Sequence, residues 1–468
     1  MLTKAVMEKL DDLTRLLEES GLRKGMEMMD QIACLLLLRD LERRADGAAG
    51  EAGFPEEIRA GGSCIPGAHL RWSVFRTFPE EEQYQTVRDW AFPFMKDMLE
   101  SRDPLCMQGA VLKIPNPALL VRILETLDEL KGLTKESFAY LLEKLWAGSG
   151  RCPQIPDPVV QLMTGLARPL PEDCICDPAC RIPELLLAAV KQWEKEGKRP
   201  ARLLRGYDMD PALVRVGNAY LHRCGTDAVS LFCLDSLSEQ NTDRDCCSLI
   251  LSAPPFRGMT DYDMVSPDLQ KGFRTKRTEL LFLELFLRML RPGGRCVCLV
   301  SPDVLSNASR SHKALRKELV EENRLEAVLH LPGGVFLPLT GIRTALLVFS
   351  RSRDAGDRTE SVWFCELEAA GRSLDGRKVP VSAEDIPAVI RQFHGREQEK
   401  ESDRSGNSFF VGREELAANG YDLSIGRYRA SPVPAEDYEE AEKLLEELKQ
   451  MEKRVLAQIR KLEQMLGK

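Results

Sequence analysis

Four short segments stand where apolar runs end, and they contain residue types that could do chemistry. They are Asp177-Pro178-Ala179-Cys180, Asp208, Asp235-Ser236 and Ala253-Pro254-Pro255-Phe256. An acidic residue that ends a strand before a tight turn into a helix is where doubly wound folds bind their ligand. One carboxylate can also accept hydrogen bonds from two hydroxyl groups at once. The segments therefore indicate a ligand site at the ends of neighbouring strands.

Seven apolar runs are the elements that must position these segments. They lie at 174–176, 201–207, 229–234, 248–252, 295–300, 325–331 and 345–349. Helical stretches of roughly 10–20 residues separate most of them, which predicts right-handed βαβ units and a parallel sheet. A short loop joins the last two runs, so we expect an antiparallel hairpin at a sheet edge. The expected fold class is α/β.

The patterning divides the chain into four parts. We expect an all-helical domain over 1–150, interrupted by a Gly/Ala-rich loop from Gly47 to Gly67, and the strand-helix domain over 151–365. Residues 366–430 form a mixed extension. Apolar residues recur every three or four positions within 431–468, which predicts a coiled-coil helix of about three heptads. A lone amphipathic helix folded back on its own domain is the alternative.

Composition limits the function classes. No window is apolar enough to span a membrane, and the N-terminus lacks a signal-peptide core, so we expect a cytoplasmic protein. None of the 14 cysteines forms a CxxC pair, and a metal site at Cys174, Cys176 and Cys180 is disfavoured because no second ligand cluster follows. Neutralisation of phosphates by Lys and Arg drives DNA affinity, and this chain has a net charge of −8. If DNA is the substrate, we therefore expect a partner to supply much of the binding affinity.

Taken in order, these segments resemble the modification subunits of type I restriction-modification systems, which are N-6 adenine-specific DNA methyltransferases. Further similar segments are Leu331-Pro332-Gly333-Gly334-Val335-Phe336 and Asn419-Gly420-Tyr421-Asp422-Leu423. The likeness spans nearly the whole chain and rests on the order and spacing of its motifs. It implies a class I S-adenosylmethionine-dependent methyltransferase sheet with an N-terminal helical domain and a C-terminal helical tail.

The resemblance also implies roles for the four segments. Asp177, Pro178, Ala179 and Cys180 match the first cofactor motif, Asp208 matches the acceptor for the ribose hydroxyls of S-adenosylmethionine, and Asp235 with Ser236 matches the segment near the cofactor adenine. In the last segment, Ala253 stands where the family has Asn, followed by Pro254, Pro255 and Phe256. There the flipped adenine stacks on the aromatic ring while the Asn and a proline carbonyl accept hydrogen bonds from its amino group.

Three departures from the family pattern fall on this one site. Residues 181–184 replace a glycine loop with Arg181, Ile182, Pro183 and Glu184, and residues 153–160 lack the aromatic, Thr and Arg residues of the family's cofactor lid. A charged Glu184 near the cofactor carboxylate would repel it by roughly 1–4 kcal/mol at 4 Å. The third departure, Ala253, removes a polar group whose loss typically costs about 10²–10³ in rate.

Two function classes remain open. One is a modification subunit that takes its specificity from a separate subunit, with methyl transfer impaired or lost; the other is a non-catalytic scaffold that holds DNA or a partner. The implied partners are DNA, a specificity subunit, and a restriction subunit or second methyltransferase.

Two basic clusters could contact phosphates, although solvated loop charge is the alternative. They are Lys271, Arg274, Lys276 and Arg277, and Arg310, Lys313, Arg316 and Lys317. A small-molecule methyltransferase is a weaker third interpretation.

Overall fold

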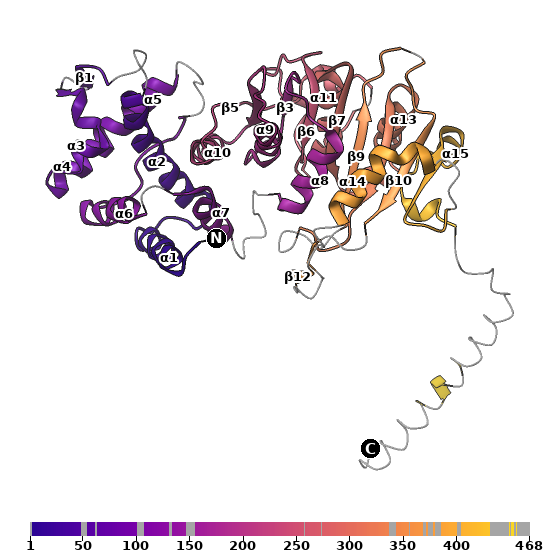
Figure 1. Cartoon of the computed structure of the whole chain (residues 1–468), viewed down its shortest axis with the longest axis horizontal. Helices are drawn as coiled ribbons and strands as arrows, with labels where there is room; N and C mark the ends of the chain where they lie inside the picture. Colours follow the sequence, from indigo (N-terminus) through magenta and orange to yellow (C-terminus); the bar gives the residue numbers. More distant parts are fainter. Residues whose placement is uncertain are drawn as a thin grey trace, which may run out of the picture.

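A nine-stranded mixed sheet carries the four predicted segments, and an N-terminal group of helices packs beside it in the computed structural model (Figure 1). The structure describes residues 2–47, 54–60, 63–100, 107–130, 133–146, 155–256, 258–272, 274–336, 343–354, 356–367, 371–372, 378–379, 385–399, 404–430, 449, 451–453 and 455.

The strand order of the sheet is β13-β10-β8-β9-β7-β6-β3-β4-β5. Its strands are β3 (Ile175–Asp177), β4 (Leu204–Asp208), β5 (Val229–Cys233), β6 (Cys247–Ser252), β7 (Leu290–Val300), β8 (Arg324–His330), β9 (Ala345–Ser350), β10 (Ser361–Glu366) and β13 (Ser408–Gly412). Strands β5, β4, β3, β6 and β7 run parallel. The chain reverses its direction of travel across the sheet at β3, between β4 and β6. This switch point is where a doubly wound sheet opens to a ligand.

Helices cover both faces of the sheet, and others form the N-terminal domain. Those of the sheet domain are α8 (Asp157–Ala167), α9 (Glu184–Lys195), α10 (Pro211–Arg223), α11 (Thr278–Met289), α12 (Pro302–Ser306), α13 (Arg310–Glu321), α14 (Asp385–Gly395) and α15 (Arg413–Ala418). The N-terminal ones are α1 (Lys4–Glu19), α2 (Met26–Gly47), α3 (Trp72–Phe75), α4 (Glu80–Gln85), α5 (Phe92–Glu100), α6 (Pro117–Glu129) and α7 (Lys135–Trp146). Helix α10 begins at Asp210, whose carboxylate accepts the Ala212 amide at 2.9 Å, with Pro211 in the first turn.

Alternate side chains of the strands enter two separate apolar cores. Leu249 and Leu251 of β6 join the core that includes α8, α9, α10 and the N-terminal helices. Ile250 of the same strand joins the core of α11 and α13. Because strand side chains alternate between faces, burial on both sides requires the near-continuous apolar runs seen in the sequence.

Two sequence-based expectations were wrong. The antiparallel pairing of β8 with β9 is confirmed, but β9 lies between β7 and β8 and not at an edge. Its residues from Ala345 to Phe349 are all buried, and the strand is hydrogen-bonded to a neighbour on each side. The N-terminal domain is also not wholly helical, since β1 (Glu57–Ala60) pairs with β2 (Ser63–Pro66) within the expected loop. Ile58 and Ile65 face each other in that hairpin and pack against the core.

A buried ion pair joins the N-terminal domain to the sheet domain. Arg215 of α10 donates to both carboxylate oxygens of Asp30 of α2, from Nε at 2.6 Å and from Nη2 at 2.9 Å. Arg215 is 2% exposed and Asp30 is 4% exposed. Farther along the same two helices, Asp40 pairs with Arg223 and lies 3.6 Å from His222 Nδ1. Since α10 starts directly after β4, these pairs tie the helical domain to one of the predicted ligand-binding strands.

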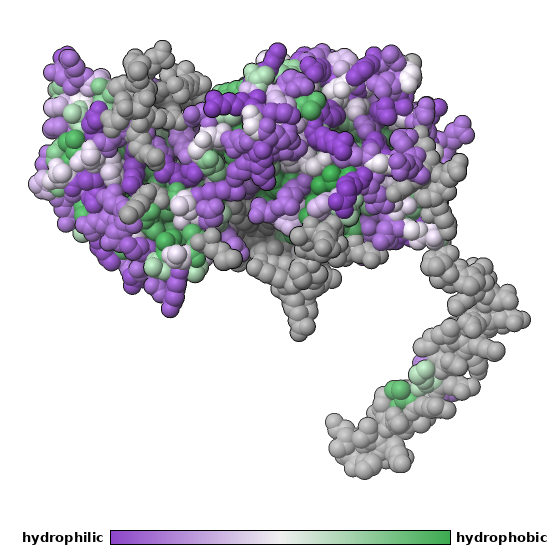
Figure 2. Space-filling view, viewed as in Figure 1, coloured by the Kyte–Doolittle hydropathy of each residue, from purple (hydrophilic) through white to green (hydrophobic). Residues whose placement is uncertain are grey.

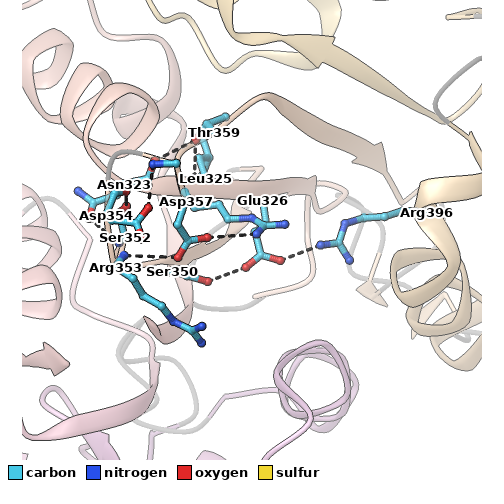
Figure 3. Close-up of polar contacts among 12 residues, drawn as sticks. Asn323, Leu325, Glu326, Ser350, Ser352, Arg353, Asp354, Asp357, Thr359 and Arg396 are labelled. Carbon is cyan, nitrogen blue, oxygen red and sulfur yellow. Dashed lines mark hydrogen bonds and ion pairs between the residues drawn. The ribbon is translucent and has the colours of Figure 1, made fainter. Parts of the chain in front are cut away.

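A polar network lies at the amino-terminal ends of β8 and β10 and links them to β9 and to the segment after α14 (Figure 3). The carboxylate of Glu326 accepts from Ser350 Oγ of β9 at 2.6 Å and from Arg396 Nη2 at 2.7 Å. Arg324 at the start of β8 donates to Asp357 at 3.3 Å. The network lies at the opposite edge of the sheet from the four predicted segments.

Of the predicted coiled-coil tail, most lies outside the described residues. Met451 and Val455, two positions of its apolar seam, are described and are more than half exposed. Among the described residues, no helix combines the length and apolar character that a membrane crossing needs. The face shown in Figure 2 is mainly hydrophilic, with apolar groups in small scattered areas.

Candidate functional site

The first predicted segment closes the carboxyl end of β3 and is bonded to its neighbours. Asp177 is 2% exposed, and its Oδ1 accepts from Ser252 Oγ of β6 at 2.6 Å and from the Ala179 amide at 3.1 Å. Burial raises the pKa of Asp177 to about 6, against the lowering effect of the hydrogen bond from Ser252. The segment therefore joins β3 to β6 as well as facing the switch point.

The turn after Asp177 is joined to β4 and to the Asp235-Ser236 segment. The carbonyl of Pro178 accepts from Ser236 Oγ at 2.7 Å, and the Cys180 amide donates to the Tyr207 carbonyl at 2.9 Å. Cys180 packs so closely on Gly206 that a Cβ there would lie 2.6 Å from its Sγ. Gly206 is required because of this close approach.

Asp208 lies at the carboxyl end of β4, and both its oxygens accept backbone hydrogen bonds. Oδ1 accepts the Asp210 amide at 2.8 Å, and Oδ2 accepts the Arg181 amide at 3.2 Å. Burial raises the pKa of Asp208 to about 6. Asp235, after β5, is half-buried, and its Oδ1 accepts the Leu237 amide at 3.0 Å. The structure thus brings the predicted cofactor segments to one edge of the sheet, with their carboxylates fixed by the local backbone.

Arg181 connects the first segment to the fourth. Its backbone has φ of 43°, the left-handed region that favours glycine, at the position where the family has its glycine loop. Its guanidinium Nη2 donates to the Ala253 carbonyl at 3.3 Å. The side chain therefore spans from the turn after β3 to the loop after β6. Sequence reasoning identified Arg181 only as a lost glycine and did not predict this contact, because local sequence does not determine where a long side chain points.

Ala253 and Phe256 lie in the fourth segment, directly after β6. Ala253 is 2% exposed and belongs to the apolar core, so it brings no side-chain acceptor to the site. The Phe256 ring is half-buried and meets Phe336 edge to face, with the centroids 6.3 Å apart and an interplanar angle of 85°. Of the two prolines between them, Pro254 is buried and Pro255 is exposed. Phe336, from the Leu331–Phe336 segment, therefore packs against the fourth segment.

Glu184 differs from its sequence-based expectation. It begins α9 and is 8% exposed, and neither of its carboxyl oxygens has a hydrogen-bond partner. Burial raises the pKa of Glu184 well above its usual value. Burial without a hydrogen-bond partner therefore disfavours the charged form of this carboxyl group.

The structure describes part of the expected lid segment and several of the cysteines. In the expected lid segment, Pro153 and Gln154 lie outside the described residues, whereas Val159 and Val160 are buried in α8. Among the described residues, no group of His, Cys, Asp or Glu side chains is placed to hold a metal ion. The described cysteine pair Cys296 and Cys298 is fully buried in β7, where thiols act as small apolar groups.

Comparisons with known proteins show which family the chain resembles. The family model described as N-6 DNA Methylase matches residues 139–437. The type I restriction enzyme EcoEI methylase subunit of Escherichia coli is 25% identical over 464 residues, covering 90% of this chain and 89% of that protein. The EcoKI methylase subunit of Escherichia coli strain K12 is 21% identical and covers 72% of this chain and 70% of its own length.

Solved structures show the same fold. A chain from a structural study of complex assembly and conformational transition of the type I R-M system has a TM-score of 0.70 at 20% identity, covering 99% of this chain and 98% of that chain. The type I restriction-modification methyltransferase subunit from Streptococcus thermophilus has a TM-score of 0.67 at 16% identity, covering 92% and 99%. The α/β methyltransferase fold predicted from the sequence is confirmed. Since the family model matches more than half of its length, this chain belongs to the N-6 DNA methylase family.

Proposed function

We propose that this chain is a modification subunit of a type I restriction-modification complex in which the chain's own methyl transfer is impaired or lost. In this role it retains a structural function and associates with DNA, a specificity subunit, and a restriction subunit or second methyltransferase. The observation that carries the proposal is the hydrogen bond from the Arg181 guanidinium to the Ala253 carbonyl.

The cofactor that the family implies is S-adenosylmethionine, and the residues fit its two ends unequally. Asp208 and Asp235 are acceptors suited to ribose hydroxyls and to an adenine amino group. The turn at 181–184 does not suit the methionine end, because bulky side chains replace the glycines that allow close backbone approach. A guanidinium at the Ala253 carbonyl would also repel the sulfonium, by roughly 1–4 kcal/mol at 4 Å depending on screening.

The target side of the site supports the same proposal. An aromatic ring remains at Phe256, but Ala253 offers a buried methyl group where the family's Asn provides an acceptor. A base stacked on Phe256 would therefore lack one of the contacts that orient its amino nitrogen toward the methyl group. Loss of such a group typically costs about 10²–10³ in rate, in addition to the weakened cofactor binding.

The test is calorimetric titration of the full chain with S-adenosylmethionine. We expect no saturable heat below about 1 mM cofactor, equivalent to less than roughly 4 kcal/mol of binding free energy. Micromolar binding by the unaltered chain would contradict the proposal. A variant that combines Arg181→Gly, Pro183→Gly, Glu184→Gly and Ala253→Asn is expected to gain binding.

A matched control is available at Arg168, which also has φ of 43° but lies at the end of α8. Arg168→Gly makes the same exchange at the same backbone conformation without changing the site. It is expected to leave cofactor binding as weak as in the unaltered chain. A gain of binding in this control would mean that general relaxation of the backbone, and not removal of the Arg181 side chain, accounts for the effect.

A further inference from the structure

Helix α13 presents three lysine and arginine side chains on one exposed face. Arg310, Lys313 and Lys317 lie at positions i, i+3 and i+7, and all three are exposed. The rotation of the helix is fixed by Arg316, which is 2% exposed and donates to the carbonyls of Tyr421, Val304 and Asn307. Arg316 is thus a structural residue and not a member of a solvated basic cluster, and its burial directs its neighbours outward.

A second basic segment lies against the beginning of this helix. The carbonyl of Arg274 accepts from Ser311 Oγ of α13 at 3.2 Å. The backbone at Arg274 therefore lies against the first turn of α13, although more than thirty residues of sequence separate Arg277 from Arg310, and the side chains of Arg274 and Arg277 are exposed. We name Arg274, Arg277, Arg310, Lys313 and Lys317 together the basic strip.

The basic strip begins beside the predicted target-base segment. Met259, three residues after Phe256, forms an isolated antiparallel bridge with Arg277. The Thr278 amide donates to the Gly258 carbonyl at 3.0 Å, which extends this pairing. From there the strip follows α13 away from the site for about 10 Å, given the 1.5 Å rise per residue between Arg310 and Lys317.

The charges of the strip are not neutralised by close partners in the described part of the chain. Two other cations of the same segment are paired there, Lys271 with Asp268 at 2.8 Å and Lys276 with Asp261 at 3.1 Å. None of the five strip residues forms an ion pair with a described residue. On a chain with a net charge of −8, such a line of unpaired cations is a local feature and not a general surplus.

We propose that the basic strip binds the phosphate backbone of duplex DNA next to the target-base segment, and that it does so without cofactor or methyl transfer. The proposal rests on the proposed function in assigning DNA as the partner. Each strand carries a phosphate every 3.4 Å along the duplex axis, so a row about 10 Å long can face roughly three phosphates. Contacts of this kind position a protein on DNA but carry no sequence information, which leaves specificity to another subunit.

The experiment measures binding of the full chain to a fluorescent duplex of arbitrary sequence by anisotropy over a series of KCl concentrations, without cofactor. A variant with Arg310→Gln, Lys313→Gln and Lys317→Gln removes three strip charges. Its slope of log K against log [KCl] is expected to be smaller by up to about 3, with weaker binding at every salt concentration.

A comparison variant carries Lys195→Gln, Lys198→Gln and Arg199→Gln, three exposed cations at the end of α9 and in the loop that follows, of which Lys198 is paired with Glu196 at 2.8 Å. It changes the net charge equally and is expected to keep the slope of the unaltered chain. Equal losses in both variants, an unchanged slope in the strip variant, or no DNA binding by the unaltered chain would each overturn the proposal. Poly-glutamate serves as a probe for an acidic protein partner. If the strip variant loses poly-glutamate binding as much as it loses DNA binding, the proposal is also overturned.

Cofactor titration does not enter this experiment, so its outcome is separate from the test of impaired methyl transfer. A chain that binds S-adenosylmethionine tightly could still use the strip, and a chain that binds no cofactor could lack DNA binding. Far-ultraviolet circular dichroism and thermal unfolding of both variants check that the exposed substitutions leave the fold intact.

Discussion

Replacing Asp30 with alanine should strongly destabilise the contact between α2 and α10. The carboxylate accepts two hydrogen bonds from the Arg215 guanidinium, at 2.6 and 2.9 Å. Another bond, from Nη1 to the Gln108 carbonyl at 3.1 Å, would remain. With Arg215 only 2% exposed, the variant would keep the guanidinium buried while removing the Asp30 carboxylate that faces it. Breaking a buried pair in this way typically costs about 3–5 kcal/mol.

That cost is large compared with the roughly 5–15 kcal/mol by which folded proteins are stable. Urea unfolding followed by far-ultraviolet circular dichroism would measure it. With a slope near 3 kcal/mol per molar urea, the midpoint of Asp30→Ala should fall by roughly 1–2 M. The double variant Asp30→Leu with Arg215→Met should recover most of the loss, because apolar replacement of a complete buried pair is often neutral or stabilising.

The exposed pair Lys4–Glu8, at 3.8 Å, is the matched control, and Glu8→Ala should leave the midpoint unchanged. A decrease of less than about 1 kcal/mol for Asp30→Ala would refute the reasoning, since it would mean that Arg215 reaches water when its partner is removed. A double variant no better than the single one would show that packing, and not the uncompensated charge, dominates.

Two further predictions concern the site. Because burial raises the pKa of Asp177 to about 6, its protonation stabilises the folded chain below about pH 4, and this contribution is lost as the pH rises through 6. Asp177→Asn should therefore reduce the difference in melting temperature between pH 5 and pH 7.5, and an unchanged difference would contradict the assignment. In Gly206→Ala, the added Cβ would lie 2.4 Å from a Leu231 methyl carbon and 2.6 Å from Cys180 Sγ. Thermal unfolding should show a loss of about 1–3 kcal/mol, partly recovered by adding Cys180→Ala, and an unchanged melting temperature would show that the turn shifts freely.

The local pattern of the sequence predicted most of the strands but not their neighbours. The buried run from Ala345 to Phe349 predicted a strand correctly, whereas its position between β7 and β8 depends on pairings between distant segments. Strands β10 and β13 were not predicted. They complete the sheet through an antiparallel pairing of Ser361–Glu366 with Ser408–Gly412, across about forty residues of sequence.

The candidate site was predictable as a set of positions and not as a set of contacts. The family resemblance identified Asp177, Asp208 and Asp235, and the structure brings all three to one edge of the sheet. The family resemblance did not predict that Glu184 would be buried without a hydrogen-bond partner or that the Arg181 side chain would reach the Ala253 carbonyl. Both outcomes depend on the space left by the surrounding helices, which residue type and spacing do not specify.

The Arg181 contact has a consequence for how the protein should respond to its surroundings. A ligand that binds only the folded state stabilises it by RT ln(1 + [L]/Kd), so an ordinary methyltransferase becomes more heat-resistant as its cofactor accumulates. In this chain a covalently attached guanidinium already joins the two strand ends, at an effective concentration that does not change with metabolism. On the proposed function, the abundance and heat resistance of this protein would be the same in methionine-starved cells and in cells with ample methionine.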